Sequence, residues 1–274
     1  MDKRYPLLDM NPMQAYEQYM VPGIMIPGVN LMLQYALPQV GERVLDIACG
    51  TGIAARTVAP LVGTQGKVTA LDINPAMLAV GRGLPQPQGA SIDWREGSAL
   101  SLPLPDSAYD LVVCHQGFQF FSDKLLALRE AKRILVPGGR IVLSVQQTLQ
   151  HNPIYQHFNE VLIGRMKMPA LAAPFSFGDA EPLRAVLTEA GFSRVEVIPV
   201  SHTIRFPGID IYLQASVIGS AAVIQEMARL DADAKTQLVD EISRDMQDTL
   251  APYVEADGTL VMPLNANIGS GIAN

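Results

Sequence analysis

The sequence predicts an α/β fold, a doubly wound sheet of seven strands that is mostly parallel with one antiparallel strand. Short apolar runs alternate with helical stretches from Arg43 to Val145, and a glycine-rich turn follows the first run. Apolar residues make up 49% of the 274 residues, enough for a large core. Strands that alternate with helices form βαβ units whose parallel sheet is covered on both faces.

The first five strands are buried apolar runs separated by helix signals. Asn74 followed by Pro75 is a typical start of a helix, since asparagine caps the first turn and proline fits its first position. The predicted strands are Arg43–Ala48, Lys67–Asp72, Ser91–Glu96, Tyr109–His115 and Arg140–Val145. The predicted helices are Gly52–Leu61, Pro75–Arg82 and Lys124–Leu135, the last of them stopped by Pro137-Gly138-Gly139.

The later part of the chain is less regular. We expect a helix over Ala180–Ala190, a strand over Val195–Phe206, a helical segment over Ile209–Leu250 and a last strand over Gly258–Ile268. Two late strands separated by a helical insertion would add the antiparallel strand to the sheet.

A stretch without charged residues runs from Gln18 to Gly41. Pro22, Pro27 and Pro38 interrupt it, so an apolar lid is favoured over a membrane span, with membrane contact left open. The predicted organisation is one domain over 1–274, with an N-terminal lid at 1–42, a cofactor-binding core at 43–145, substrate-covering insertions at 146–180 and 208–255, and the last strand at 258–268.

Charge and cysteine content limit the function classes. The net charge is −7 and the pI is near 5.1, and no run of lysine or arginine occurs, so nucleic acid is not an expected partner. Cys49 and Cys114 lie in apolar surroundings, which predicts reduced thiols in a cytoplasmic protein. No cluster of histidine, cysteine or carboxylate residues has metal-ligand spacing, and we expect no metal.

The turn after the first strand is the strongest functional signal. Gly50-Thr51-Gly52-Ile53-Ala54-Ala55 fits the dinucleotide pattern G-x-G-x-x-A, and Asp72 follows where a ribose-binding acid is expected, so NAD is a live alternative. Asp46, just before the turn, would repel a pyrophosphate but suits the ammonium and sulfonium of S-adenosylmethionine. The alternative role for Asp46 and Asp72 is helix capping or turn formation.

Four ordered segments resemble the class I S-adenosylmethionine-dependent methyltransferases, which have a Rossmann-like sheet. They are Val44–Gly52 (VLDIACGTG), Ala70–Leu78 (ALDINPAML), Leu102–Asp123 (LPLPDSAYDLVVCHQGFQFFSD) and Leu128–Val145 (LREAKRILVPGGRIVLSV). The similarity is closest to the ubiquinone/menaquinone-biosynthesis type and its relatives that methylate small molecules. It spans Arg43 to Val145, and the segments outside it would choose the acceptor.

The resemblance implies roles for individual residues. Asp46, Gly50 and Gly52 would line the methionyl part of the cofactor, and Asp72 would bind the ribose. The others implied are Ile73 and Met77 on the adenine, Gly97, Ser98 and Ala99 at its edge, and Cys114 to Gln116 at the end of the fourth strand. Two residues depart from the family: Ala48 replaces a loop glycine, which is tolerable at negative φ, and Ser98 stands where an aspartate often accepts from the adenine amino group.

Several side chains are candidates for the chemistry itself. His115 follows the fourth strand, where ligands of open α/β sheets bind, and is the candidate general base. Tyr19 is expected to close over the cofactor, and the residues expected near the acceptor are Tyr16, Gln119, Phe120 and His151. Ordinary packing is the alternative for each of these side chains, and His202 is expected to be structural.

These observations predict methyl transfer from S-adenosylmethionine to O, N or C of a small, largely apolar acceptor. Two alternatives stay open: an NAD(P)-dependent oxidoreductase, and a catalytically inactive methyltransferase-like binding protein. The expected partner is a small-molecule substrate, with no integral membrane span, and a homodimer is left open.

Overall fold

A computed structural model describes residues 5–166, 171–220, 227 and 229–274 of the chain. Parts of the two predicted covering insertions, 167–170, 221–226 and 228, lie outside the described residues. The chain forms two compact units. The sheet unit comprises Gly28–Thr148, Ala173–His202 and Asn265–Asn274, and the helical unit comprises Met1–Pro27, Leu149–Ala172 and Thr203–Leu264.

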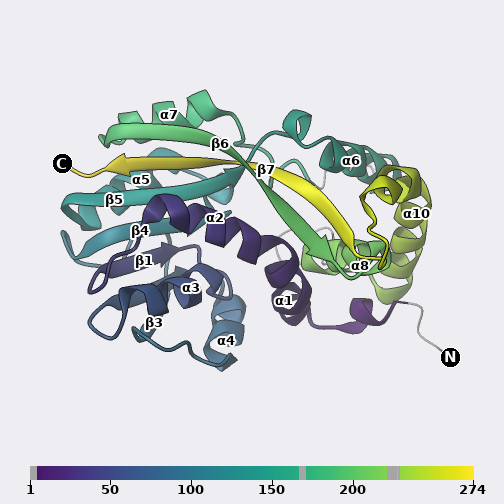
Figure 1. The fold of residues 1–274 in the computed structure, drawn as a ribbon, viewed down its shortest axis with the longest axis horizontal. Coiled ribbons are helices and arrows are strands. Elements are labelled where there is room, and N and C mark those ends of the chain that lie inside the picture. The colour runs from purple at the N-terminus through teal and green to yellow at the C-terminus, as the bar shows by residue number, and fades with distance from the viewer. Residues whose placement is uncertain (1–4, 167–170, 221–226, 228) are drawn as a thin grey trace. The chain divides into compact units, whose positions relative to one another are not determined.

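Seven strands form one sheet in the order β3-β2-β1-β4-β5-β7-β6 (Figure 1). Strands β1 to β5 pair in parallel, and β7 pairs antiparallel with β5, which confirms the predicted fold class. The strand order reverses between β1 and β4, and such a switch point is where open α/β sheets bind ligands. The strands are β1 Arg43–Ile47, β2 Lys67–Asp72, β3 Ile92–Glu96, β4 Tyr109–His115, β5 Leu135–Gln146, β6 Ser193–Phe206 and β7 Leu260–Ile272.

Helices cover both faces of the strands in the sheet unit. Successive β4 residues Val112 and Val113 belong to different cores, because side chains alternate across a sheet. One core contains α5 (Lys124–Ile134) and α7 (Ala180–Glu189). The other contains residues of α2 (Ile26–Ala36), α3 (Ile53–Val62) and α4 (Pro75–Gly83).

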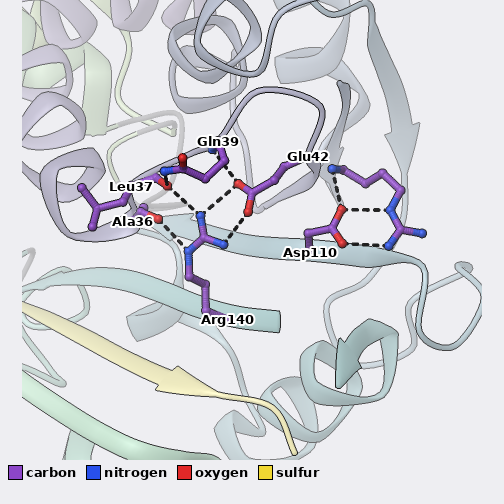
Figure 2. A network of polar contacts seen from close by, with 7 residues as sticks. Ala36, Leu37, Gln39, Glu42, Asp110 and Arg140 are labelled. Carbon is purple, nitrogen blue, oxygen red and sulfur yellow. Dashed lines mark hydrogen bonds and ion pairs between the residues drawn. The ribbon is translucent and has the colours of Figure 1, made fainter. Parts of the chain in front are cut away.

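The carboxyl end of α2 is held by Arg140 of β5 (Figure 2). Its guanidinium donates to the carbonyl oxygen of Ala36 at 2.7 Å and to that of Leu37 at 2.9 Å. The same group donates to both carboxylate oxygens of Glu42, at 2.7 and 2.9 Å. The last carbonyls of a helix have no partner within the helix, so this arginine replaces the missing donors and ties α2 to the sheet.

The helical unit is built around an aromatic core. Phe206 and Tyr212 pack edge to face with ring centroids 5.2 Å apart, and Phe158 lies 6.2 Å from the same tyrosine. The Tyr5 hydroxyl donates to Asp240 at 2.6 Å, which fixes the N-terminal segment to the longest helix. The helices described in this unit are η1 Pro6–Asp9, α1 Pro12–Ala15, η2 Tyr16–Met25, η4 Leu149–His151, α6 Pro153–Met166, α8 Ile209–Ser220, α10 Ala232–Leu250 and η5 Ala251–Tyr253.

Some boundaries differ from those expected. Pro137-Gly138-Gly139 lies inside β5, where the pairing with β4 shifts register, whereas the sequence predicted that the strand begins only at Arg140. Pro22 lies inside the π-helix η2, although proline cannot donate a hydrogen bond to a helix. The last strand extends to Ile272 rather than Ile268. In the part of the chain that the structure describes, no helix is long and apolar enough to cross a membrane.

Candidate active site

The loop Ala48–Gly52 joins the carboxyl end of β1 to the amino end of α3. Gly52 is the N-cap of α3 at φ 81°, in the left-handed region that glycine adopts without strain. A side chain on Gly52 would also collide with the ring of Trp94, which packs on Gly81 of α4 as well. Gly50, by contrast, has no atom within 4 Å of the position that a Cβ would occupy. The loop is therefore packed against Trp94 at Gly52, whereas Gly50 faces open space.

Ala48 adopts a backbone conformation that the sequence did not predict. Its φ is 55°, so the condition under which alanine was judged tolerable in place of the family's glycine, a negative φ, is not met. Gly117, in the turn after β4, lies so close that a Cβ there would be 2.6 Å from the Ala48 Cβ. A left-handed alanine costs about 1–2 kcal/mol, and such strain is often found at functional sites.

Asp72 connects the ends of β1 and β2. Its Oδ2 accepts a hydrogen bond from the Gly50 amide at 2.7 Å, and its Oδ1 accepts one from the Asn74 amide at 2.8 Å. Burial raises the pKa of Asp72, while these two donors act in the opposite direction. Each carboxylate oxygen has a second lone pair available, so the group can still accept from a ribose hydroxyl. Asp72 therefore stabilises a turn, which was the alternative role considered for it from the sequence. Its contact with a ribose stays a prediction.

Asp46 is almost completely buried, with 1% of its surface exposed. Its Oδ2 accepts from the Ala55 amide at 2.9 Å and so caps the first turn of α3. Burial raises the pKa of Asp46 to about 8, with a smaller contribution from the charge of Asp72. The carboxyl is therefore mostly protonated at neutral pH, and the sequence-based argument that its negative charge repels a pyrophosphate is weaker than expected.

The predicted adenine contacts surround the ends of β2 and β3. Ile73 is 70% exposed beside Asp72, where a flat ring could cover it. Met77 is buried in α4. The Gly97 amide donates to the Asp72 carbonyl at 3.0 Å, and the Ser98 hydroxyl accepts from the Leu100 amide at 3.2 Å. Ala99, the last predicted contact at this edge, is buried.

His115 is half-buried at the end of β4. Its Nδ1 lies 2.6 Å from the Ser144 hydroxyl, and its ring packs on Gly28 of α2, where a Cβ would be 2.6 Å from His115 Cε1. Burial, with a smaller contribution from His202, lowers the pKa of His115 to about 3. A group with so low a pKa is a weak proton acceptor near neutrality, which counts against the predicted role as general base.

His202 lies beside the same helix. Its Nε2 is 3.4 Å from the Cβ position of Gly28, and both ring nitrogens are buried without a hydrogen-bond partner among the described residues. Burial lowers the pKa of this imidazole too. The sequence predicted a structural histidine here and gave no signal that its nitrogens would be unsatisfied.

Gln116 closes the end of β4. Its φ is 55°, a left-handed conformation, and its Oε1 accepts from the Gln146 amide at 3.1 Å and from Gln119 Nε2 at 3.2 Å. Cys114, two residues earlier, is buried, and burial together with the charges of Asp46 and Asp72 raises the pKa of its thiol to about 12. The thiol is therefore protonated and unreactive.

The remaining predicted residues are divided between the two units. Phe120 belongs to the sheet unit and is 43% exposed. Tyr16, Tyr19 and His151 belong to the helical unit, and their contacts with cofactor or acceptor stay predictions. Sequence reasoning missed four residues at the site. Strand pairing brings in Trp94, Ser144 and Gln146. The Thr51 hydroxyl is buried and has no hydrogen-bond partner among the residues that the structure describes. Within the described ranges, no group of three or more histidine, cysteine or carboxylate side chains could hold a metal ion.

Comparisons with known proteins agree with this geometry. Residues 44–139 match the methyltransferase domain family. The 2-phytyl-1,4-naphtoquinone methyltransferase of Synechococcus elongatus is 31% identical over 160 residues, 58% of this chain and 68% of the relative. The ubiquinone/menaquinone biosynthesis C-methyltransferase UbiE of Hahella chejuensis is 42% identical over 116 residues, 42% of this chain and 46% of the relative.

Solved structures share the fold. YcgJ of Bacillus subtilis superposes with a TM-score of 0.58 at 21% identity and covers 90% of this chain and 98% of its own. The phosphoethanolamine N-methyltransferase 2 of Haemonchus contortus, in complex with S-adenosyl-L-methionine, has a TM-score of 0.57 at 17% identity and covers 99% of this chain and 60% of its own.

The chain belongs to the class I S-adenosylmethionine-dependent methyltransferases, on the branch of the ubiquinone/menaquinone-biosynthesis enzymes. It transfers a methyl group from S-adenosylmethionine to a small molecule. Neither the NAD(P)-dependent oxidoreductase nor the inactive binding protein is favoured. The open space at Gly50, the Asp72 carboxylate and the exposed Ile73 fit the methionyl, ribose and adenine parts of this cofactor.

Proposed function

We propose that the acceptor is the reduced, hydroquinone form of an apolar quinone, methylated on a ring carbon. The observation that carries this proposal is the similarity to a 2-phytyl-1,4-naphtoquinone methyltransferase over 68% of that relative. An oxidised quinone ring is poor in electrons, whereas a hydroquinone ring is a carbon nucleophile. Methyl transfer from a sulfonium needs an electron-rich acceptor, so the reduced form is the reactive one.

Binding and orientation are the tasks of the protein in this reaction. The bound cofactor supplies an electrophilic methyl group whose thioether leaving group is already activated. Asp72 would hold the ribose, Ile73 and Met77 would pack on the adenine, and Asp46, Gly50 and Gly52 would surround the methionyl part. Phe120, in the same unit as these residues, would contact the acceptor. Alignment of nucleophile, methyl and sulfur accounts for most of the catalysis of such a displacement.

A hydroquinone acceptor also fits the weak basicity of His115. A buried imidazole with a pKa of about 3 removes protons poorly at neutral pH. A ring already activated by two hydroxyl groups depends less on such a base than an alcohol or an ammonium does. The acidic charge of −7 further disfavours anionic acceptors such as phosphate esters.

The test is transfer of labelled methyl from S-adenosylmethionine to acceptors of different chemistry. We expect incorporation into the ring of 1,4-naphthohydroquinone, kept reduced with dithionite, at a rate at least tenfold above that for oxidised 1,4-naphthoquinone. Phosphoethanolamine, an anionic amine, is the control and should accept nothing above background. Transfer to phosphoethanolamine with none to the hydroquinone would contradict the proposal.

A cytoplasmic location is also proposed, because both cysteines are free thiols. Cys49 and Cys114 are both buried and unpaired, which suits the reducing cytoplasm.

A further inference from the structure

Three glutamines meet at the carboxyl ends of β4 and β5. Gln116 follows β4, Gln119 lies in the short helix η3 (Phe118–Phe120), and Gln146 ends β5. Gln119 is 5% exposed and Gln146 is 8% exposed. Long polar side chains are rarely so buried unless their amide groups are satisfied.

The hydrogen bonds fix how these amides point. The Gln146 backbone N–H can only donate, so the Gln116 atom that receives it at 3.1 Å must be the carbonyl oxygen. Gln119 approaches the same oxygen at 3.2 Å and must therefore present its amide nitrogen. The Oε1 of Gln119 consequently points away from Gln116.

That oxygen has no partner. Gln119 Oε1 is buried, and it accepts no hydrogen bond from any described residue. A flip of the amide would not help, because it would set two carbonyl oxygens against each other. Buried acceptors without a donor are rare in native proteins, and a ligand donor is one way to satisfy them.

The turn that carries Gln119 adjoins the cofactor loop. Gly117 begins this turn, and a Cβ on it would be 2.6 Å from the Ala48 Cβ and 3.6 Å from the Ala48 carbonyl oxygen. Ala48 is the first residue of the loop Ala48–Gly52, whose two glycines are proposed to surround the methionyl part of the cofactor. Gln119 is therefore two residues from a direct contact with that loop.

The electrostatic field at this place is negative. The Asp72 carboxylate contributes to the raised pKa values of both cysteine thiols, that of Cys49 within the loop and that of Cys114 on β4. A negative field favours a positively charged group. An ammonium carries three donors and no acceptor, so it matches an unpaired carbonyl oxygen better than a hydroxyl does.

We propose that Gln119 Oε1 accepts a hydrogen bond from the α-ammonium of the methionyl part of the cofactor, and that Gln116 is the positioning residue that orients it. This assignment replaces the sequence-based prediction that Gln119 contacts the acceptor. It rests on S-adenosylmethionine being the cofactor. The proposed donor to Gln119 Oε1 is the ammonium, and not a buried water or a donor group of the acceptor.

The test is a thermodynamic cycle by calorimetry. Wild type and Gln119→Met are titrated with S-adenosylhomocysteine and with its analogue that lacks the α-amino group. Methionine keeps the length of glutamine without its polar atoms. We expect Gln119→Met to bind S-adenosylhomocysteine at least about tenfold more weakly and the analogue with less than about twofold change. Gln116→Met should show the same selectivity with a smaller loss, since its role is indirect.

Gln86→Met is the matched control, because Gln86 is exposed and its side-chain amide donates to the nearby Leu84 carbonyl. Unchanged affinity of Gln119→Met for S-adenosylhomocysteine would overturn the proposal in favour of water or the acceptor. An equal loss for both ligands would overturn it as well. If Gln119→Met does not fold, Gln119→Asn, which retracts the oxygen by one methylene, replaces it in the cycle. Failure of wild type to bind S-adenosylhomocysteine would instead remove the cofactor assignment itself.

Discussion

Replacing Asp72 with alanine is expected to lower the affinity for S-adenosylhomocysteine by at least about a hundredfold. The carboxylate accepts from the Gly50 amide at 2.7 Å and from the Asn74 amide at 2.8 Å, so it shapes both the cofactor loop and the start of α4. The alanine variant loses these two charge-assisted bonds and the proposed ribose contact together. Calorimetric titration measures the effect.

Asp93→Ala is the control for Asp72→Ala. Asp93 lies on the neighbouring strand and pairs with Arg95 at 2.7 Å, with both side chains largely exposed. Such exposed pairs contribute little, so the affinity should change less than about twofold. Asp72→Asn separates the role of Asp72 in shaping the loop from its proposed role in binding the ribose, because an amide oxygen can still accept from one backbone N–H. An affinity of Asp72→Ala within threefold of wild type would remove the structural basis of the ribose site.

Replacing Asp46 with asparagine is expected to stabilise the protein at about pH 8 by about 2 kcal/mol or more. The pKa of Asp46 is raised from 3.8 to about 8 in the folded protein. Between these values the folded state keeps a proton that the unfolded chain has released, so wild-type stability falls as the pH rises through this window. Asparagine has no such proton and can still accept from the Ala55 amide. Thermal unfolding from about pH 5 to pH 8 measures the difference.

The advantage of Asp46→Asn over wild type should therefore be small near pH 5 and grow toward pH 8. The same variant should bind S-adenosylmethionine more weakly, because a buried carboxyl that ionises beside a cation adds attraction that an amide cannot supply. A difference in unfolding temperature that is the same at both pH values would show that Asp46 does not titrate in this range.

The boundaries of strands that are buried on both faces could be predicted from the sequence alone. The predicted strands Lys67–Asp72 and Tyr109–His115 agree with the structure residue for residue, because parallel central strands are continuous apolar runs. The capping of α4 by Asn74 was equally local and is present, with the side chain accepting from the Ala76 amide.

Features that depend on distant contacts could not be predicted in this way. The left-handed backbone of Ala48 accompanies its close contact with Gly117, nearly seventy residues later. The orientation of Gln119 is fixed through Gln116 by an amide on another strand. The pKa of His115 depends on burial, which only the folded chain creates, so its suitability as a base could not be judged from its position at a strand end.

The central claim is that the carboxyl ends of β1, β2 and β4 bind S-adenosylmethionine rather than a nicotinamide dinucleotide. Calorimetric titration of the purified protein with S-adenosylhomocysteine, with NADH in a parallel experiment, tests it most directly. We expect a single site of roughly micromolar affinity for the first ligand and no heat of binding for the second. Binding of NADH without binding of S-adenosylhomocysteine would contradict the account.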